Sequence, residues 1–213
     1  MKKMSLFTLA VVLLLLAVSC RELLSEKSDL KLATPATVED NQALIDQFGF
    51  MNVDFASVGE TSSDDFYMTD ADYDGLYYEQ DKRLYTWMPD HVTRPSSAGN
   101  AWSRCYRAIY ISNSVLHNLE TYHLTGAKAD QVKGQALALR ASRYLDASQI
   151  WCPAYRQSSA SGELGLPLRL DPDMNTPSVR STVQQTYDQI LSDLHAALPL
   201  LPGPYLSFYG ELR

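Results

Sequence analysis

Apolar residues recur every three or four positions along three stretches of the second half of the chain, which predicts three long helices. The first begins near residue 102 and buries one stripe, formed by Trp102, Tyr106, Ile109, Asn113 and Leu116. The second, about 129–150, is apolar on two sides, with Val132, Ala136 and Leu139 on one and Leu137, Ala141 and Leu145 on the other. We therefore expect it to lie inside.

The third helix is predicted to open at Ser181-Thr182-Val183-Gln184, which has the spacing of a capping box, and to end before Pro199. Its inward residues are expected to be Val183, Tyr187, Ile190, Leu194 and Leu198. Paired helices of this length favour antiparallel hairpins stacked like tetratricopeptide repeats, although no clean repeat is present. The predicted fold class is mostly α, with such hairpins packed against an irregular, loop-rich region.

That irregular region spans residues 54–101, where helical periodicity fades and Asp, Ser, Gly, Tyr and Pro accumulate. A long loop of this kind is functional or disordered, and its aromatic content argues against disorder. Upstream, Thr37-Val38-Glu39-Asp40 predicts a helix start, with Ala43, Leu44, Phe48 and Met51 continuing at helical spacing. A second loop, 152–180, separates the last two long helices.

The N-terminus is typical of a secretory signal. Lys2 and Lys3 precede an apolar run too short to anchor in a bilayer, and small residues lead into Cys20. A cysteine at this place predicts a lipoprotein signal peptide, residues 1–19, with Cys20 as the acylated anchor in the membrane. An ordinary cleaved signal is the alternative. The polar stretch 20–36 is then expected to be a tether.

Charge excludes one class of partner. The chain has 18 basic and 25 acidic residues, and removing residues 1–19 leaves 16 basic residues and a net charge of −9. Nucleic acid is therefore not an expected partner. Cys105 and Cys152 remain after lipidation; a disulfide is possible in the cell envelope, and two buried thiols are the interpretation that we favour.

Catalytic motifs are missing from the sequence. It has no nucleophile elbow, no paired-histidine metal helix and no phosphate loop, and its four histidines share no ligand spacing (His91, His117, His123 and His195). We expect no enzyme, and a glycosidase would need two of the acids at 64–81 to flank a cleft. Arg140 lies in a buried helix, so we expect it either to pair with a carboxylate, for which Asp193 is one candidate, or to cap carbonyls.

One metal site is conceivable in the loop-rich region. Four aspartates have the spacing of a calcium loop around Gly75 (Asp70, Asp72, Asp74 and Asp81). The twelfth position holds Asp rather than Glu, and no strong helix precedes the loop. A solvated acidic turn is the alternative, and no other cofactor is expected.

Several motifs in order resemble one family. Tyr85-Thr86-Trp87 is followed by Trp102-x3-Tyr106-x2-Ile109-x3-Asn113, then by Ala136-x2-Leu139-Arg140-Ala141-x2-Tyr144 and Trp151-Cys152-Pro153. Gly165-Leu166-Pro167-Leu168 and Arg180-Ser181-Thr182-Val183-x3-Tyr187 come next. This order, with the lipoprotein signal, resembles SusD/RagB nutrient-binding lipoproteins of the outer membrane.

The resemblance implies a lipid-anchored protein at the cell surface. Such a protein captures an oligosaccharide, or less often a peptide, and acts as the lid of a SusC-like TonB-dependent transporter. Family members run to more than twice this length, so residues 37–213 are expected to be an N-terminal region without the C-terminal ligand-binding half. The alternative is a helical-repeat module that docks on the transporter without holding ligand.

Within this chain, Trp87 is the best candidate for ligand contact. It lies in the irregular region just before the first long helix, where the resemblance places ligand-contacting aromatic rings, and a flat ring suits the apolar face of a sugar. Asp65, Arg83 and Asn100 are candidate polar neighbours. Trp87 packed beneath the loops is the alternative, whereas Trp102 is expected in the core.

Overall fold

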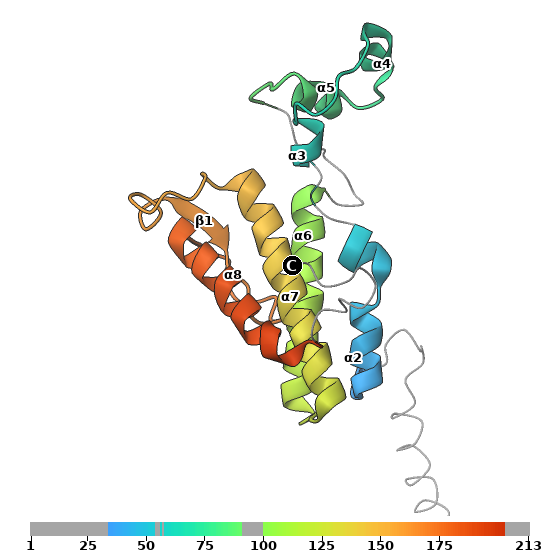
Figure 1. Ribbon diagram of the computed structural model, residues 1–213, viewed down its shortest axis with the longest axis vertical. Coiled ribbons are helices and arrows are strands. Elements are labelled where there is room, and N and C mark those ends of the chain that lie inside the picture. The colour runs from blue at the N-terminus through green and yellow to red at the C-terminus, as the bar shows by residue number, and fades with distance from the viewer. Residues whose placement is uncertain (1–33, 54–55, 57, 91–99, 203–213) are drawn as a thin grey trace, which may run out of the picture. The chain divides into compact units, whose positions relative to one another are not determined.

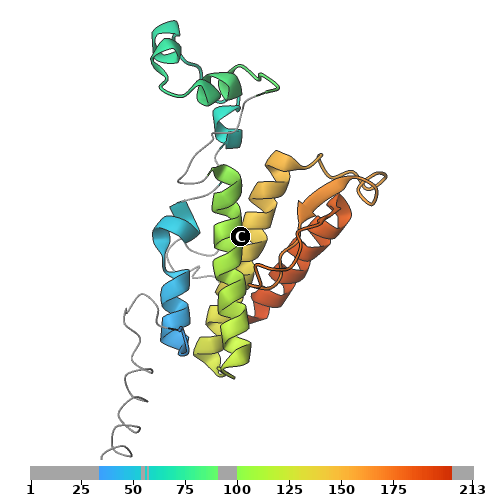
Figure 2. The same ribbon diagram turned by 180° about the vertical axis from the view of Figure 1, so that it is seen from behind.

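The computed structural model describes residues 34–53, 56, 58–90 and 100–202. It is mostly helical, as predicted, and three long helices lie side by side in the order α6, α7, α8 (Figures 1 and 2). The predicted signal peptide and Cys20 lie outside the described residues. The elements are α2 (Val38–Ile45), η2 (Gly49–Val53), α3 (Val58–Thr61), α4 (Asp70–Gly75), α5 (Glu79–Tyr85), α6 (Ala101–Thr121), α7 (Ala127–Trp151), β1 (Leu164–Pro167), β2 (Arg180–Thr182), α8 (Val183–Ala197) and η3 (Leu198–Leu200).

Helices α6 and α7 form an antiparallel hairpin closed by a tight turn. His123, at φ 52°, ends α6 in the left-handed region, and Leu124 returns its N–H to the Leu119 carbonyl at 2.9 Å. This is a Schellman cap, and Leu124 packs on the core beside it. Helix α7 is buried on both sides, as its composition predicts, so it is the central helix.

Two apolar clusters fill the space around α7. One lies among α2, α6 and the start of α7 (Ile45, Met51, Val115, Leu119, Val132 and Ala136). The other joins α6 and α7 to β1 and α8 (Cys105, Ile109, Ala141, Tyr144, Leu166 and Ile190). Trp102, expected in the core, is half-buried at its edge and contacts Trp151 with ring centroids 5.1 Å apart.

A buried polar network crosses the three long helices. The Arg140 guanidinium on α7 donates to both carboxylate oxygens of Asp193 on α8, at 2.6 and 2.7 Å, and to Asn113 Oδ1 on α6 at 2.8 Å. This confirms the predicted Arg140–Asp193 pair. Asn113 Nδ2 then donates to the Arg169 carbonyl in the loop between β1 and β2. One cation therefore fixes three helices and a loop.

The rotation of α8 differs from the prediction. Its buried residues are Val183, Thr186, Ile190, Asp193 and Ala197. Leu194 and Leu198, expected inside, are 42% and 75% exposed. The cause is Asp193: its pairing with Arg140 places a carboxylate in the interior, and the adjacent Leu194 consequently faces outward.

The start of α8 is also shifted by one residue from the expected capping box. Thr182 Oγ1 accepts from Gln185 N–H at 3.1 Å, and Gln185 Oε1 accepts from Thr182 N–H at 2.9 Å. Ser181 cannot cap because it lies in β2 and donates to the Leu166 carbonyl. Strands β1 and β2 pair antiparallel, and a Cβ at Gly165 would lie 2.3 Å from the Thr182 carbonyl oxygen, so this approach requires glycine.

Helix α2 starts as predicted, with Thr37 and Asp40 forming a capping box. It ends at Ile45 rather than continuing, so Phe48 is exposed while Met51, on the short π-helix η2, is fully buried. The Arg143 side chain donates to the Met51 carbonyl at 2.5 Å and fixes η2 to α7. Among the described residues, the structure contains no helix with the length and apolarity to span a membrane.

Candidate functional site

Residues 58–90, which we call the aromatic segment, are held together by the Tyr85 ring. It lies 5.9 Å from Phe66 and 6.1 Å from Tyr73, centroid to centroid, and its hydroxyl accepts from Met68 N–H at 2.9 Å. The Ser62 hydroxyl donates to the Leu84 carbonyl at 3.1 Å and joins α3 to α5. The predicted loop-rich region therefore contains three short helices, of which α5 contacts both α3 and α4.

Trp87 occupies an unusual backbone position at the end of α5. Its N–H donates to the Leu84 carbonyl at 3.2 Å, and the next N–H, of Met88, reaches back to the Arg83 carbonyl at 2.8 Å. These two bonds form a Schellman cap in which Trp87, at φ 57°, takes the left-handed place where glycine is usual. A non-glycine residue there costs about 1–2 kcal/mol.

The side chain at this position faces solvent. Trp87 is 75% exposed, so the interpretation that it packs beneath the loops is wrong. Other aromatic rings of the segment are exposed as well, and Tyr77 and Tyr78 meet edge to face at 4.7 Å. Sequence reasoning missed these tyrosines, although the Tyr-Tyr pair after Gly75 was a signal. The exposed set is Phe66, Tyr67, Tyr77, Tyr78 and Trp87.

The predicted polar neighbours of Trp87 are only partly brought together. Arg83 lies on α5, four residues before Trp87, and its guanidinium pairs with Glu79 at 3.2 Å and Asp90 at 2.8 Å. Asp65 is exposed next to Phe66. Asn100 belongs to another element: its Oδ1 caps α6 by accepting from Ser103 N–H at 3.1 Å. Ligand contact by these residues stays a prediction.

The four aspartates of the possible calcium loop lie on two helices. Asp70, Asp72 and Asp74 are on α4, and Asp81 is on α5. Within the described ranges, no three His, Cys, Asp or Glu side chains gather as a metal site would require. A calcium loop wraps its alternate oxygens around one cation, whereas successive residues on a helix point to different sides. Calcium binding stays a prediction.

Two further features bear on chemistry. Neither Cys105 nor Cys152 forms a disulfide, and burial raises the pKa of the Cys152 thiol. A protonated thiol is a poor nucleophile. Three of the four histidines are exposed (His117, His123 and His195), and His91 lies outside the described residues.

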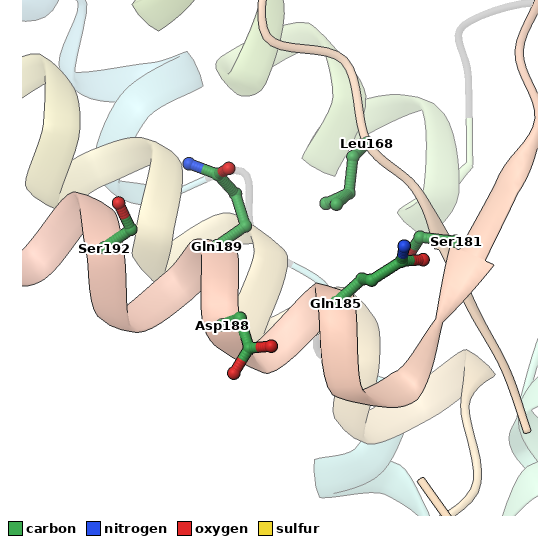
Figure 3. A pocket seen from close by; sticks show the side chains of 6 residues that line it. All are labelled: Leu168, Ser181, Gln185, Asp188, Gln189 and Ser192. Carbon is green, nitrogen blue, oxygen red and sulfur yellow. The ribbon is translucent and has the colours of Figure 1, made fainter. Parts of the chain in front are cut away.

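A shallow groove of about 490 Å³ runs along α8 (Figure 3). Its lining is polar apart from Leu168, and it comprises Leu168, Ser181, Gln185, Asp188, Gln189 and Ser192. Two of these polar side chains already make hydrogen bonds within the protein, because Gln185 caps α8 and Gln189 donates to Asp193 at 2.8 Å. The groove also carries no aromatic ring, so the aromatic segment is the stronger candidate surface.

Comparison with solved structures gives the same fold. A SusD superfamily protein from Bacteroides thetaiotaomicron VPI-5482 matches with a TM-score of 0.59 and 21% identity, over 78% of this chain and 38% of that one. A putative sugar binding protein from Bacteroides vulgatus ATCC 8482 matches with a TM-score of 0.62 and 20% identity, over 81% of this chain and 39% of that one. A SusD superfamily protein from the same strain matches with a TM-score of 0.57 and 24% identity, over 79% of this chain and 38% of that one.

The chain thus spans about two fifths of the length of the solved structures that it matches. No curated protein matches it. A family model, SusD-like, described as starch-binding and associating with the outer membrane, matches residues 22–210. Since that match covers most of the 213 residues, the chain belongs to the SusD-like family.

Proposed function

We propose that this protein captures glycans at the outer membrane, on the surface that the aromatic segment presents. The observation that carries the proposal is Trp87, whose indole is exposed and whose backbone is kept in a left-handed conformation. Strain of this kind collects at functional sites and persists where surrounding contacts hold the backbone, as the two capping hydrogen bonds do here. A flat exposed indole suits the apolar face of a sugar ring.

We infer that the other exposed rings of the segment extend this surface. Tyr77 and Tyr78 follow α4, and Phe66 is tied to α5 through Tyr85. Several exposed rings beside the short helices can contact successive sugar units of one oligosaccharide, whereas Arg83 and Asp65 offer donors and acceptors to its hydroxyl groups. The function that follows is ligand binding without catalysis.

The family description, which links starch binding with the outer membrane, supports the location. We propose that Cys20 carries the lipid anchor and that the protein serves as ligand-capture partner and lid of a SusC-like TonB-dependent transporter. Pull-down of the native protein from detergent-solubilised envelope, with intact mass analysis, tests both points. Co-elution of a large barrel with a lipid-modified chain starting at Cys20 supports them, and an unlipidated chain recovered alone contradicts them.

Binding itself is tested by screening residues 20–213 on an oligosaccharide array and titrating the best ligand by calorimetry. Trp87→Ala should lower the affinity for that ligand at least tenfold, since an indole face of about 80 Å² buried at 25 cal/mol per Å² contributes about 2 kcal/mol. The matched control is Tyr110→Ala, which removes an exposed ring from α6.

Two results would contradict glycan capture at Trp87. Equal losses in Trp87→Ala and Tyr110→Ala would place the binding elsewhere. Absence of saturable binding to any oligosaccharide would favour the alternative, a helical module that docks on the transporter without ligand.

A further inference from the structure

The net charge of the chain is concentrated in the aromatic segment. Residues 58–90 contain nine acidic and two basic residues, a net charge of −7. The chain without residues 1–19 has 25 acidic and 16 basic residues, so the rest of it carries sixteen acidic and fourteen basic residues, a net charge of only −2. The surface that displays Trp87 is therefore strongly acidic, in contrast to the remainder of the protein.

The two cations of this segment are both engaged within it. Arg83 pairs with Glu79 and Asp90. Lys82 Nζ donates to the Asp74 carbonyl at 3.2 Å and lies 5.5 Å from the centre of the Tyr73 ring. A sulfate or carboxylate on a ligand would therefore have to compete with these contacts for the two cations of the segment.

The acidic side chains are close enough to Trp87 to act on its ligand. Glu79 and Asp81 are on α5, a seven-residue helix about 10 Å long that ends beside Trp87. The aspartates of α4 are next to α5, since Tyr73 of α4 contacts Tyr85. The screening length at physiological salt is about 8 Å, so much of this charge is only partly screened at the indole.

We propose that the aromatic segment selects uncharged or cationic glycans and rejects polyanionic ones, such as sulfated or uronate-rich oligosaccharides. This inference rests on the proposed function, because it concerns the ligand of the same surface. If the seven net charges are treated as lying about 10 Å from the ligand, Coulomb's law in water with screening at 0.15 M salt gives roughly a fourfold loss of affinity for each negative charge on the ligand. A ligand with three such charges would bind roughly sixtyfold more weakly than its neutral counterpart.

The test uses residues 20–213 and an array in which neutral oligosaccharides are printed beside their sulfated, carboxylated and amine-bearing forms. The neutral form of the best backbone should bind more tightly than its anionic forms at 0.05 M NaCl, and the difference should largely vanish at 1 M, where the screening length is about 3 Å. The affinity for the neutral form should be unchanged by salt.

Charge variants sharpen the test. Replacing Asp70, Asp72 and Asp74 together by Asn should raise the affinity for the anionic form several-fold and leave the neutral form unchanged. The matched control, Glu39→Gln, Glu120→Gln and Asp130→Asn, neutralises three exposed acids outside the segment and should change neither affinity. If the triple variant does not fold, the salt series on the unmodified chain still decides the question.

The outcomes separate the two proposals. If no oligosaccharide of any charge binds, glycan capture is wrong and the charge selection falls with it. If glycans bind but anionic forms bind as tightly as neutral ones at 0.05 M NaCl, glycan capture stands and the charge selection is wrong.

Discussion

Replacement of Trp87 by glycine separates the stability of the α5 cap from ligand binding. Trp87 has φ 57°, which costs an L-residue about 1–2 kcal/mol, whereas glycine adopts this conformation freely. Glycine loses about 0.5–1 kcal/mol more conformational entropy on folding. The indole is mostly exposed, so little burial is lost. Trp87→Gly should therefore leave the cap unchanged or stabilise it by up to about 1 kcal/mol.

Hydrogen exchange measures this directly, because the amides of Trp87 and Met88 donate the two capping hydrogen bonds. Their protection should be kept or increased in Trp87→Gly and should fall in Trp87→Ala, which retains the left-handed strain and loses the remaining indole contacts. Calorimetry on the same variants should give a loss of about 2 kcal/mol in glycan affinity, close to thirtyfold, for both.

The chain provides a matched control in His123. This residue ends α6 with φ 52° in the same type of cap, with Leu124 donating to the Leu119 carbonyl. His123→Gly should stabilise its helix by a similar amount and leave glycan affinity unchanged. The reasoning is refuted if Trp87→Gly lowers amide protection as much as Trp87→Ala, or if it binds glycan as well as the unmodified chain.

Three further predictions concern the helical core and are checked by urea unfolding. Asp193→Leu should cost about 3–5 kcal/mol, because it leaves Arg140 buried without its carboxylate, whereas adding Arg140→Met should restore most of the loss. Ile190→Ala should cost about 2–4 kcal/mol and Leu194→Ala less than about 1 kcal/mol; equal costs would contradict the observed rotation of α8, in which Ile190 is buried and Leu194 faces outward. Burial raises the pKa of Tyr144 to about 12 from an ordinary 10.0, so its contribution to stability is complete below pH 10 and is lost as pH rises towards 12. Tyr144→Phe should reduce this loss of stability at alkaline pH. If the unfolding free energy of Tyr144→Phe falls with pH as steeply as that of the unmodified chain, the prediction is wrong.

The helical architecture could be predicted because burial follows the period of the sequence. The two-sided burial of α7 is a direct consequence of where apolar residues recur, and the stripe predicted on α6 is buried at Ile109 and Asn113 and half-buried at its other three positions. The Arg140–Asp193 pair could also be predicted from the sequence, since a buried cation favours a carboxylate partner. The capping box of α2 could be predicted because it is formed within four consecutive residues of the sequence.

The rotation of α8 could not be predicted by the same rule. A hydrophobic pattern favours Leu194 inside, but the bidentate Arg140–Asp193 contact turns the helix so that Asp193 is buried instead. The cap moved for a similar reason: Ser181 is needed by the β1 pairing, which leaves Thr182 as the next hydroxyl. Long-range polar contacts decided both cases, and periodicity within one helix carries no information about them.

The candidate site could be predicted only at its centre. The place of Trp87 before the first long helix is visible in the sequence, but its left-handed backbone follows from the cap of α5, which sequence spacing does not reveal. Asn100 is near Trp87 along the chain, whereas its side chain caps α6. Proximity along the chain is a weak guide to proximity in space within irregular regions.

Acrylamide quenching of tryptophan fluorescence tests the central claim most directly. Of the three tryptophans, Trp102 and Trp151 are half-buried against each other, so Trp87 is the most accessible to the quencher. A saturating neutral oligosaccharide should protect Trp87 and remove most of the quenching that Trp87→Gly also removes. If the oligosaccharide binds and the quenching is unchanged, the ligand does not cover Trp87, and capture of glycans on the aromatic segment is contradicted.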